Sequence, residues 1–208
     1  MHPDINNFNA QALLDLNRKC WGYFEDPLVE YERQKCPFRD ANMPAQADKF
    51  FIYNNKNFAL CRTYPTKLLF PSKASAYLIE ATGKYRSSNR LEGFTYYDHK
   101  SGTSIWRCSQ PKPGFFGTRS AEDEELLRHI GNMCESGRVV IYDARGQLAA
   151  MGNKLKGGGY ENMDNYSNCT LKFADIENIH AVRDYAEKYT MIGYNTSFNQ
   201  TNNTNQWS

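Results

Sequence analysis

Short apolar runs separated by turn-forming residues predict strands in the first half of the chain. Two runs, 50–53 and 58–61, flank an asparagine-rich segment, which predicts a hairpin. A third run, 68–70, lies between two prolines and is expected to form another strand. Apolar residues at helical spacing predict a weakly marked helix over 8–20 and a clearer one over 73–83, where a glycine ends it.

The second half of the chain alternates strand-like and helix-like patterns. A helix is predicted from about 121 to 133, because Ser120 precedes a first turn rich in acidic residues, which favours a helix start. The other predicted elements are strands over 94–97, 104–107, 139–142 and 171–174 and a helix over 178–190. The run 139–142 is apolar throughout, as in a strand covered on both faces. This alternation predicts an α/β fold with some parallel strand pairing.

Composition narrows the class of protein. The 208 residues are 40% hydrophobic and 14% aromatic, which suits one domain, or one domain with a short extra piece. A net charge of +2 gives no reason to expect a nucleic-acid partner. No apolar run is long enough for a transmembrane helix, and the first residues do not resemble a secretory signal.

The six cysteines and four histidines are scattered along the chain. No two cysteines have the C-x-x-C spacing and the histidines form no spaced cluster, so neither a metal site nor a cofactor is expected. Without a secretory signal, the cysteines are expected to be reduced thiols in a cytosolic protein. A phosphate-attacking cysteine needs an arginine six positions later, and no cysteine in this sequence has one.

The most unusual string is the triple glycine at 157–159, flanked by Lys154 and Lys156. Glycines let successive backbone N–H groups point into one concavity, which together with the lysines could hold an anion. The string lacks the spacing of a P-loop or of a dinucleotide-binding loop. A flexible surface loop is the alternative, and a nucleotide site is a further one.

Polar residues follow two of the predicted strands. Asp143 and Arg145 come directly after the run 139–142, and Asn178 comes shortly after 171–174. Ligands of open α/β sheets bind at the carboxyl ends of the strands, so these turns are candidate edges of a site. For Asp143 and Arg145 an ordinary ion pair within the turn is the alternative, and His180 on its own is expected to be structural.

Several strings occur in one order along the chain and are highly specific as a set. They are 60–65 (LCRTYP), 85–90 (YRSSNR), 107–111 (RCSQP), 117–124 (GTRSAEDE), 156–161 (KGGGYE) and 178–180 (NIH). This series resembles the myotubularin family of phosphoinositide 3-phosphatases, over roughly residues 20–188.

The resemblance implies part of a cysteine-phosphatase-like α/β domain, related to tyrosine and dual-specificity phosphatases. Such a domain has a mixed central sheet flanked by helices, and here it is expected to be incomplete at its C-terminus. Residues 1–47 are expected to be a linker after a PH-like module, 48–193 the N-terminal half of the phosphatase domain, and 194–208 an Asn-rich polar tail. The residues 91–93 (Leu-Glu-Gly) stand where the family has Ile-Pro-Val, which is expected to loosen that strand.

The resemblance also implies a function. Family members are cytoplasmic proteins that bind peripherally to endosomal membranes and remove the 3-phosphate of phosphatidylinositol 3-phosphate and 3,5-bisphosphate. They form homo- and hetero-oligomers. The residues that line the family's headgroup pocket match Asn153, Asn178 and Ile179 of this chain.

The family's catalytic loop, Cys-Ser-Asp-Gly-Trp-Asp-Arg, does not occur in the 208 residues. Without that cysteine and arginine, the chain as given is expected to be an inactive portion of the enzyme. The alternative is a non-catalytic adaptor of the pseudophosphatase type, which binds phosphoinositide or an active relative.

Overall fold

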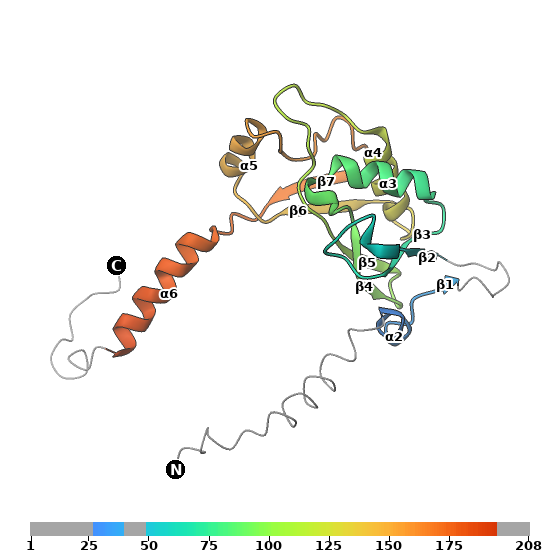
Figure 1. Cartoon of the computed structure of the whole chain (residues 1–208), viewed down its shortest axis with the longest axis horizontal. Helices are drawn as coiled ribbons and strands as arrows, with labels where there is room; N and C mark the ends of the chain where they lie inside the picture. The colour runs from blue at the N-terminus through green and yellow to red at the C-terminus, as the bar shows by residue number, and fades with distance from the viewer. Residues whose placement is uncertain (1–26, 40–48, 195–208) are drawn as a thin grey trace, which may run out of the picture.

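The computed structural model describes residues 27–39 and 49–194, which form three small β-sheets with helices around them (Figure 1). The elements follow in the order α2 (Pro27–Arg33), β1 (Phe38–Arg39), β2 (Phe50–Asn54), η2 (Lys56–Phe58), β3 (Lys67–Pro71), α3 (Ala76–Tyr85), η3 (Ser87–Asn89), β4 (Gly93–Asp98), β5 (Thr103–Arg107), α4 (Ala121–Gly131), β6 (Val139–Asp143), α5 (Gln147–Lys154), β7 (Cys169–Phe173) and α6 (Ile179–Tyr194). The helix predicted over 8–20 and the tail beyond 194 lie outside the described residues.

The expected linker contains the helix α2 and the strand β1 where it is described. The buried ring of Tyr31 holds α2 against the fold, and its hydroxyl donates to the Lys67 carbonyl at 3.2 Å. The Gln34 side chain accepts a hydrogen bond from the Tyr97 amide at 2.9 Å. β1 pairs in parallel with β2. Residues 27–39 are therefore packed into the fold.

The first hairpin differs from the predicted one. β2 pairs antiparallel with β3, Phe50 opposite Pro71, so the run 58–61 is not its partner strand. The reason is Asn55, which is 1% exposed. Its side chain accepts a hydrogen bond from the Leu60 amide at 3.0 Å and donates to the Cys61 carbonyl at 2.9 Å. These backbone groups are bound by a side chain, so they are not free to pair with a strand.

The hairpin of β4 and β5 confirms the predicted strands and the turn between them. Gly102, with a φ of 72°, donates to the Asp98 carbonyl at 2.8 Å and closes the turn. Phe94 and Trp106 face inward and pack edge to face, with ring centroids 5.4 Å apart. Phe50 from β2 packs against the same rings, so side chains join this hairpin to the first sheet.

Helices α3 and α4 pack together and cover the first core. Both begin at a serine: Ser75 accepts a hydrogen bond from the Leu78 amide at 3.1 Å, and Ser120 accepts one from the Asp123 amide at 3.2 Å. The start predicted at Ser120 is thus confirmed, and each cap stabilises its helix by about 1 kcal/mol. α3 runs past Gly83 to Tyr85, because Gly83 is buried inside the helix and does not end it.

β6 and β7 pair in parallel, with Val139 opposite Cys169 and Asp143 opposite Phe173, as predicted. One face of this pair packs on the core under α4 through Val139 and Ile141. On the other face Val140 is 49% and Tyr142 67% exposed, so the expectation of cover on both faces is wrong for the described residues.

The single mixed central sheet implied by the resemblance is also not seen in the described part of the chain. Its strands form three separate sheets, of which only β1-β2-β3 is mixed. The α/β class is confirmed, and the sheets are joined through packed side chains in place of strand hydrogen bonds.

Two helices follow the parallel pair. α5 comes after β6 and was not predicted. Glycine weakens a helical pattern, and one glycine, Gly146, caps this helix while another, Gly152, lies inside it. α6 comes after β7, where a helix was predicted, and it extends away from the rest of the described molecule (Figure 1). Six of its large apolar residues are at least 45% exposed: Ile179, Val182, Tyr185, Tyr189, Met191 and Ile192.

Candidate functional site

Arg145, in the turn after β6, ties three segments together. Its guanidinium forms an ion pair with Asp143 at 2.6 Å and also donates to Gln110 Oε1 at 2.6 Å and to the Gly159 carbonyl at 2.9 Å. Burial works against ionisation of Asp143, but the hydrogen bonds from Arg145 outweigh it and lower the pKa of the carboxyl. The ion-pair alternative is therefore confirmed, and Arg145 has a structural role in holding the triple-glycine loop.

The triple-glycine loop is fixed to its neighbours. The amides of Gly157 and Gly158 donate to the carbonyls of Lys154 and Asn153, at 3.1 and 3.0 Å, and so close the end of α5. A Cβ atom at Gly158 would lie 2.6 Å from the end of the Gln110 side chain, which would have to move to admit a larger residue. Two of the three amides are engaged inside the fold, which argues against a phosphate cradle formed by this loop.

The three residues matched to the headgroup pocket lie on the helices that follow the parallel strands. Asn153 is in the last turn of α5, and its Nδ2 donates to the Ala149 carbonyl at 3.0 Å. Asn178 caps α6, because its Oδ1 accepts from the amides of His180 and Ala181 at 2.9 and 3.1 Å. Ile179 is 68% exposed. Asn153 and Asn178 are not hydrogen-bonded to each other.

The carboxyl ends of β6 and β7 do bring the starts of the two helices together. The Ile176 amide donates to the Ala144 carbonyl at 2.8 Å, and the Asp175 side chain comes so close to Gly146 that a Cβ atom there would collide with it. Residues 175 and 176, which precede α6, therefore lie beside the beginning of α5, whereas Asn153 is in the last turn of that helix.

A buried charge cluster lies between α3 and α4. Arg86, 1% exposed, binds Asp123 through two hydrogen bonds of 2.6 and 2.7 Å. Nη1 of Arg86 lies 2.5 Å from Glu161, and Nη2, which also bonds Asp123, lies 2.7 Å from Glu92. The Tyr166 hydroxyl donates to Asp123 at 2.6 Å. Sequence reasoning missed this cluster, although Arg86, Asp123 and Glu161 all belong to the specific strings.

The cluster holds three carboxyl groups around one guanidinium. Burial strongly raises the pKa of Glu92, and the attraction of Arg86 only partly opposes that shift. Neither Glu92 oxygen has a well-aligned hydrogen bond within the described residues. Glu92 therefore binds a proton more readily than an ordinary glutamate does.

Cys108, in the RCSQP string, borders this cluster. Its Sγ lies 3.6 Å from Nη1 of Arg86. Desolvation by the surrounding protein atoms nevertheless raises the pKa of this thiol to about 12, although Cys108 as a residue is exposed. Burial likewise raises the pKa of Cys36 and Cys169 to about 12. The nucleophile in cysteine chemistry is the thiolate, and raised pKa values keep these three groups in the thiol form at neutral pH.

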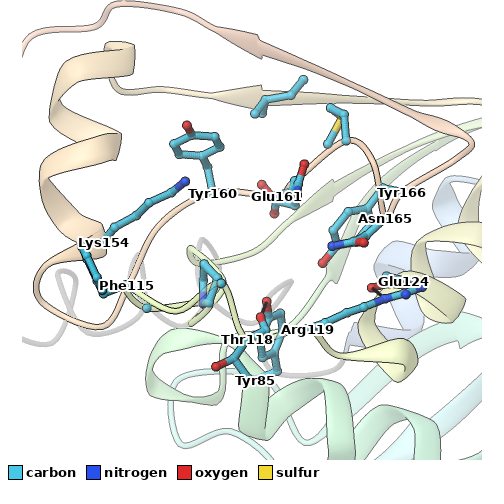
Figure 2. Close-up of a pocket in the computed structure, with 16 residues that line it drawn as sticks. Tyr85, Phe115, Thr118, Arg119, Glu124, Lys154, Tyr160, Glu161, Asn165 and Tyr166 are labelled. Carbon is cyan, nitrogen blue, oxygen red and sulfur yellow. Dashed lines mark hydrogen bonds and ion pairs between the residues drawn. The ribbon is translucent and has the colours of Figure 1, made fainter.

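A pocket of about 400 Å³ lies between residues 113–119 and 154–166 (Figure 2). The Lys154 ammonium lies 4.2 Å from the centre of the Tyr160 ring, and Arg119 is paired with Glu124 at 2.6 Å. Neither Asn153 nor Asn178 lines this pocket, so it is separate from the matched headgroup residues. Among the described residues there is no metal-binding group of three or more histidine, cysteine or acidic side chains, and no helix long and apolar enough to span a membrane.

The sequence matches the family described as "Myotubularin-like phosphatase domain" over residues 6–208. The chain belongs to the myotubularin family. Similar relatives include the mouse (Mus musculus) phosphatidylinositol-3,5-bisphosphate 3-phosphatase MTMR2, 38% identical over 172 residues, which are 82% of this chain and 26% of that protein. The mouse phosphatidylinositol-3-phosphate phosphatase MTMR7 is 43% identical over 192 residues, 90% of this chain and 27% of its own length.

Myotubularin of Xenopus laevis is 36% identical over 176 residues, which are 84% of this chain and 28% of the relative. The chain thus spans about a quarter of the length of these curated myotubularin relatives. The match covers every described element, including both helices that carry the matched headgroup residues.

Proposed function

We propose that this chain is a portion of a phosphoinositide 3-phosphatase domain and carries one wall of the headgroup site. The observation that carries the proposal is the family match over residues 6–208, together with relatives named as phosphatases of phosphatidylinositol 3-phosphate and 3,5-bisphosphate. We place its action in the cytoplasm, at the surface of endosomal membranes.

In this proposal Asn153, Asn178 and Ile179 contact the inositol ring. Amide side chains can donate to and accept from sugar hydroxyls, and the exposed Ile179 offers an apolar surface beside them. Lys154 and Lys156, next to Asn153 in sequence, add positive charge that attracts an anionic headgroup. To bind the ligand, the side chains of Asn153 and Asn178 either give up their present hydrogen bonds within α5 and α6 or use N–H groups that are not engaged in those bonds.

Bond cleavage in this proposal depends on a Cys-x5-Arg loop that is not within residues 1–208. Covalent phosphoryl transfer needs an activated nucleophile and a cation on the transferred group. Three of the cysteines have pKa values raised to about 12 by burial, and none of the six is followed by arginine at the required spacing.

The 208-residue chain is therefore expected to release no phosphate from phosphatidylinositol 3-phosphate in vesicles. The measurement is colorimetric phosphate release, with mouse MTMR2 as the positive control. Cys108→Ser serves as the matched variant, because Cys108 is the cysteine of the specific RCSQP string. Turnover by the wild-type chain that Cys108→Ser abolishes would contradict the proposal.

A non-catalytic adaptor is the second candidate function, and the exposed apolar residues favour it. Tyr142 on β6 and Tyr189 on α6 are 67% and 80% exposed, and such surface is typical of a protein interface. An adaptor would form a stable complex with an active relative in the same assay and change its rate. A mixture in which the chain neither binds MTMR2 nor alters its turnover would rule this candidate out for that relative.

A further inference from the structure

Two phenylalanines form the tip of an exposed turn at 114–117 (Gly-Phe-Phe-Gly). The Gly117 amide donates to the Gly114 carbonyl at 3.4 Å, which makes Phe115 and Phe116 the central residues of a β-turn. Phe115 is 73% and Phe116 95% exposed. Central positions of surface turns usually carry glycine, proline or small polar residues. The two rings pack edge to face on each other, with centroids 5.6 Å apart, and Phe115 also borders the pocket, but most of both side chains stays in solvent, which points to a contact with an apolar phase.

The turn presents its two rings on a fixed base. The Thr118 amide donates to the Pro113 carbonyl at 2.7 Å, and the Tyr85 hydroxyl donates to the Thr118 carbonyl at 2.8 Å. Gly114 and Gly117 take the positive φ values of the turn, 60° and 68°, so neither phenylalanine is in a left-handed conformation.

Three lysines lie close to this turn in the chain or in space, and the ammonium of one of them, Lys154, lies 4.2 Å from the centre of the Tyr160 ring. A Cβ atom at Gly114 would lie 3.8 Å from Cα of Gly157, so the triple-glycine loop and Lys156 lie beside the tip. Figure 2 shows Lys154 next to Phe115, and Lys112 precedes the turn in the chain. Within 27–39 and 49–194, none of these three lysines forms an ion pair with a carboxylate. The tip thus combines projecting aromatic rings with unneutralised cations.

We propose that the Phe115–Phe116 turn inserts into the interfacial layer of an anionic phospholipid bilayer, with Lys112, Lys154 and Lys156 against the lipid headgroups. A stable protein interface requires about 800 Å² from each partner, more than a projecting tip of two rings provides. A bilayer requires only apolar anchors and nearby basic charge, and each lysine gains from the negative potential of the membrane surface. The inference does not rest on headgroup recognition at Asn153 and Asn178.

The test is sedimentation of the 208-residue chain with phosphatidylcholine vesicles that contain about 20 mol% phosphatidylserine and no phosphoinositide. The wild-type chain is expected to bind these vesicles and to bind pure phosphatidylcholine more weakly. The double variant Phe115→Ser/Phe116→Ser is expected to lose about tenfold in binding, because its apolar anchors are gone. Ile105→Ser is the matched control, since Ile105 on β5 is 60% exposed and outside the turn; its binding stays at the wild-type value.

Depth of insertion gives a second readout. An indole introduced by Phe116→Trp is expected to be quenched by brominated lipid tails, whereas one introduced by Ile105→Trp is not. The proposal is overturned if the wild-type chain does not bind, if the double serine variant binds as tightly as wild type, or if both indoles respond equally to the brominated lipid. If the turn binds a protein partner and not a bilayer, the wild-type chain will not bind the vesicles. The vesicles contain no phosphoinositide, so each result is independent of the headgroup proposal.

Discussion

Replacing Arg86 by methionine is expected to destabilise the protein by about 3–5 kcal/mol. Methionine matches much of the length of arginine, but it leaves Asp123, Glu92 and Glu161 buried without a cation. Removing the cation of a buried ion pair leaves the remaining charge buried and uncompensated. A small domain has a total stability of about 5–15 kcal/mol, so this single change removes a large share of it.

The measurement is the free energy of unfolding in urea. Arg33→Met is the matched control, because the Arg33–Glu30 pair is an exposed ion pair in which 64% of the arginine side chain is accessible; its expected effect is within about 1 kcal/mol. Arg86→Lys keeps the charge but not the two-pronged bond to Asp123, so an intermediate loss is expected and remains measurable if the methionine variant does not fold. Equal effects of Arg86→Met and Arg33→Met would refute this account of the cluster.

Stability is expected to fall as the pH rises from about 5 to about 8, through ionisation of Glu92. Burial raises the pKa of Glu92 in the folded protein above the ordinary value of 4.5. Between the two pKa values the folded state holds a proton that the unfolded state has released. The stabilising contribution is therefore full below pH 4.5 and is lost as the pH rises, by at most ~1.4 kcal/mol per pH unit.

Glu92→Gln tests this directly, because glutamine resembles the protonated acid and does not titrate. The variant is expected to flatten the dependence of unfolding free energy on pH between about 5 and about 8. Glu32→Gln, at an exposed position of α2, is the control that leaves the slope unchanged. A variant with the wild-type slope would show that Glu92 is already ionised in the folded protein at pH 5.

The sequence predicted those helices and strands that depend on interactions between residues close together in the chain. The Ser120 cap bonds to an amide three residues later, so the sequence alone marked where α4 begins. The helix predicted over 73–83 begins at Ala76, after its cap Ser75, and ends at Tyr85. The strands β6 and β7 were predicted from two apolar runs and some parallel pairing from the general alternation of strand and helix patterns, although the helix α5 between these two strands was not predicted. The hairpin of β2 was assigned to the wrong partner, because the decisive interaction is the buried Asn55 side chain and not the alternation of apolar residues.

The charge cluster could not be derived from spacing, since its members are far apart in the chain. Asp123 is 37 residues and Glu161 is 75 residues away from Arg86 in the sequence.

The strand that was expected to loosen at 91–93 forms as β4, which begins at Gly93. The preceding residue, Glu92, lies 2.7 Å from the Arg86 guanidinium. Asn153, Asn178 and Ile179 came from the family resemblance, and their role stays a prediction. The exposed faces of β6 and α6 could not be predicted, because a sequence run does not show which face is covered.

Titration of the isotope-labelled chain with inositol 1,3-bisphosphate, followed by NMR, tests the central claim most directly. The account predicts shifts of the Asn153 and Asn178 side-chain amides, and weakening of binding by about tenfold in Asn178→Ser, which keeps a cap for α6 but has no amide. No shift at either asparagine, or equal binding by wild type and Asn178→Ser, would contradict the placement of the headgroup site on these two helices.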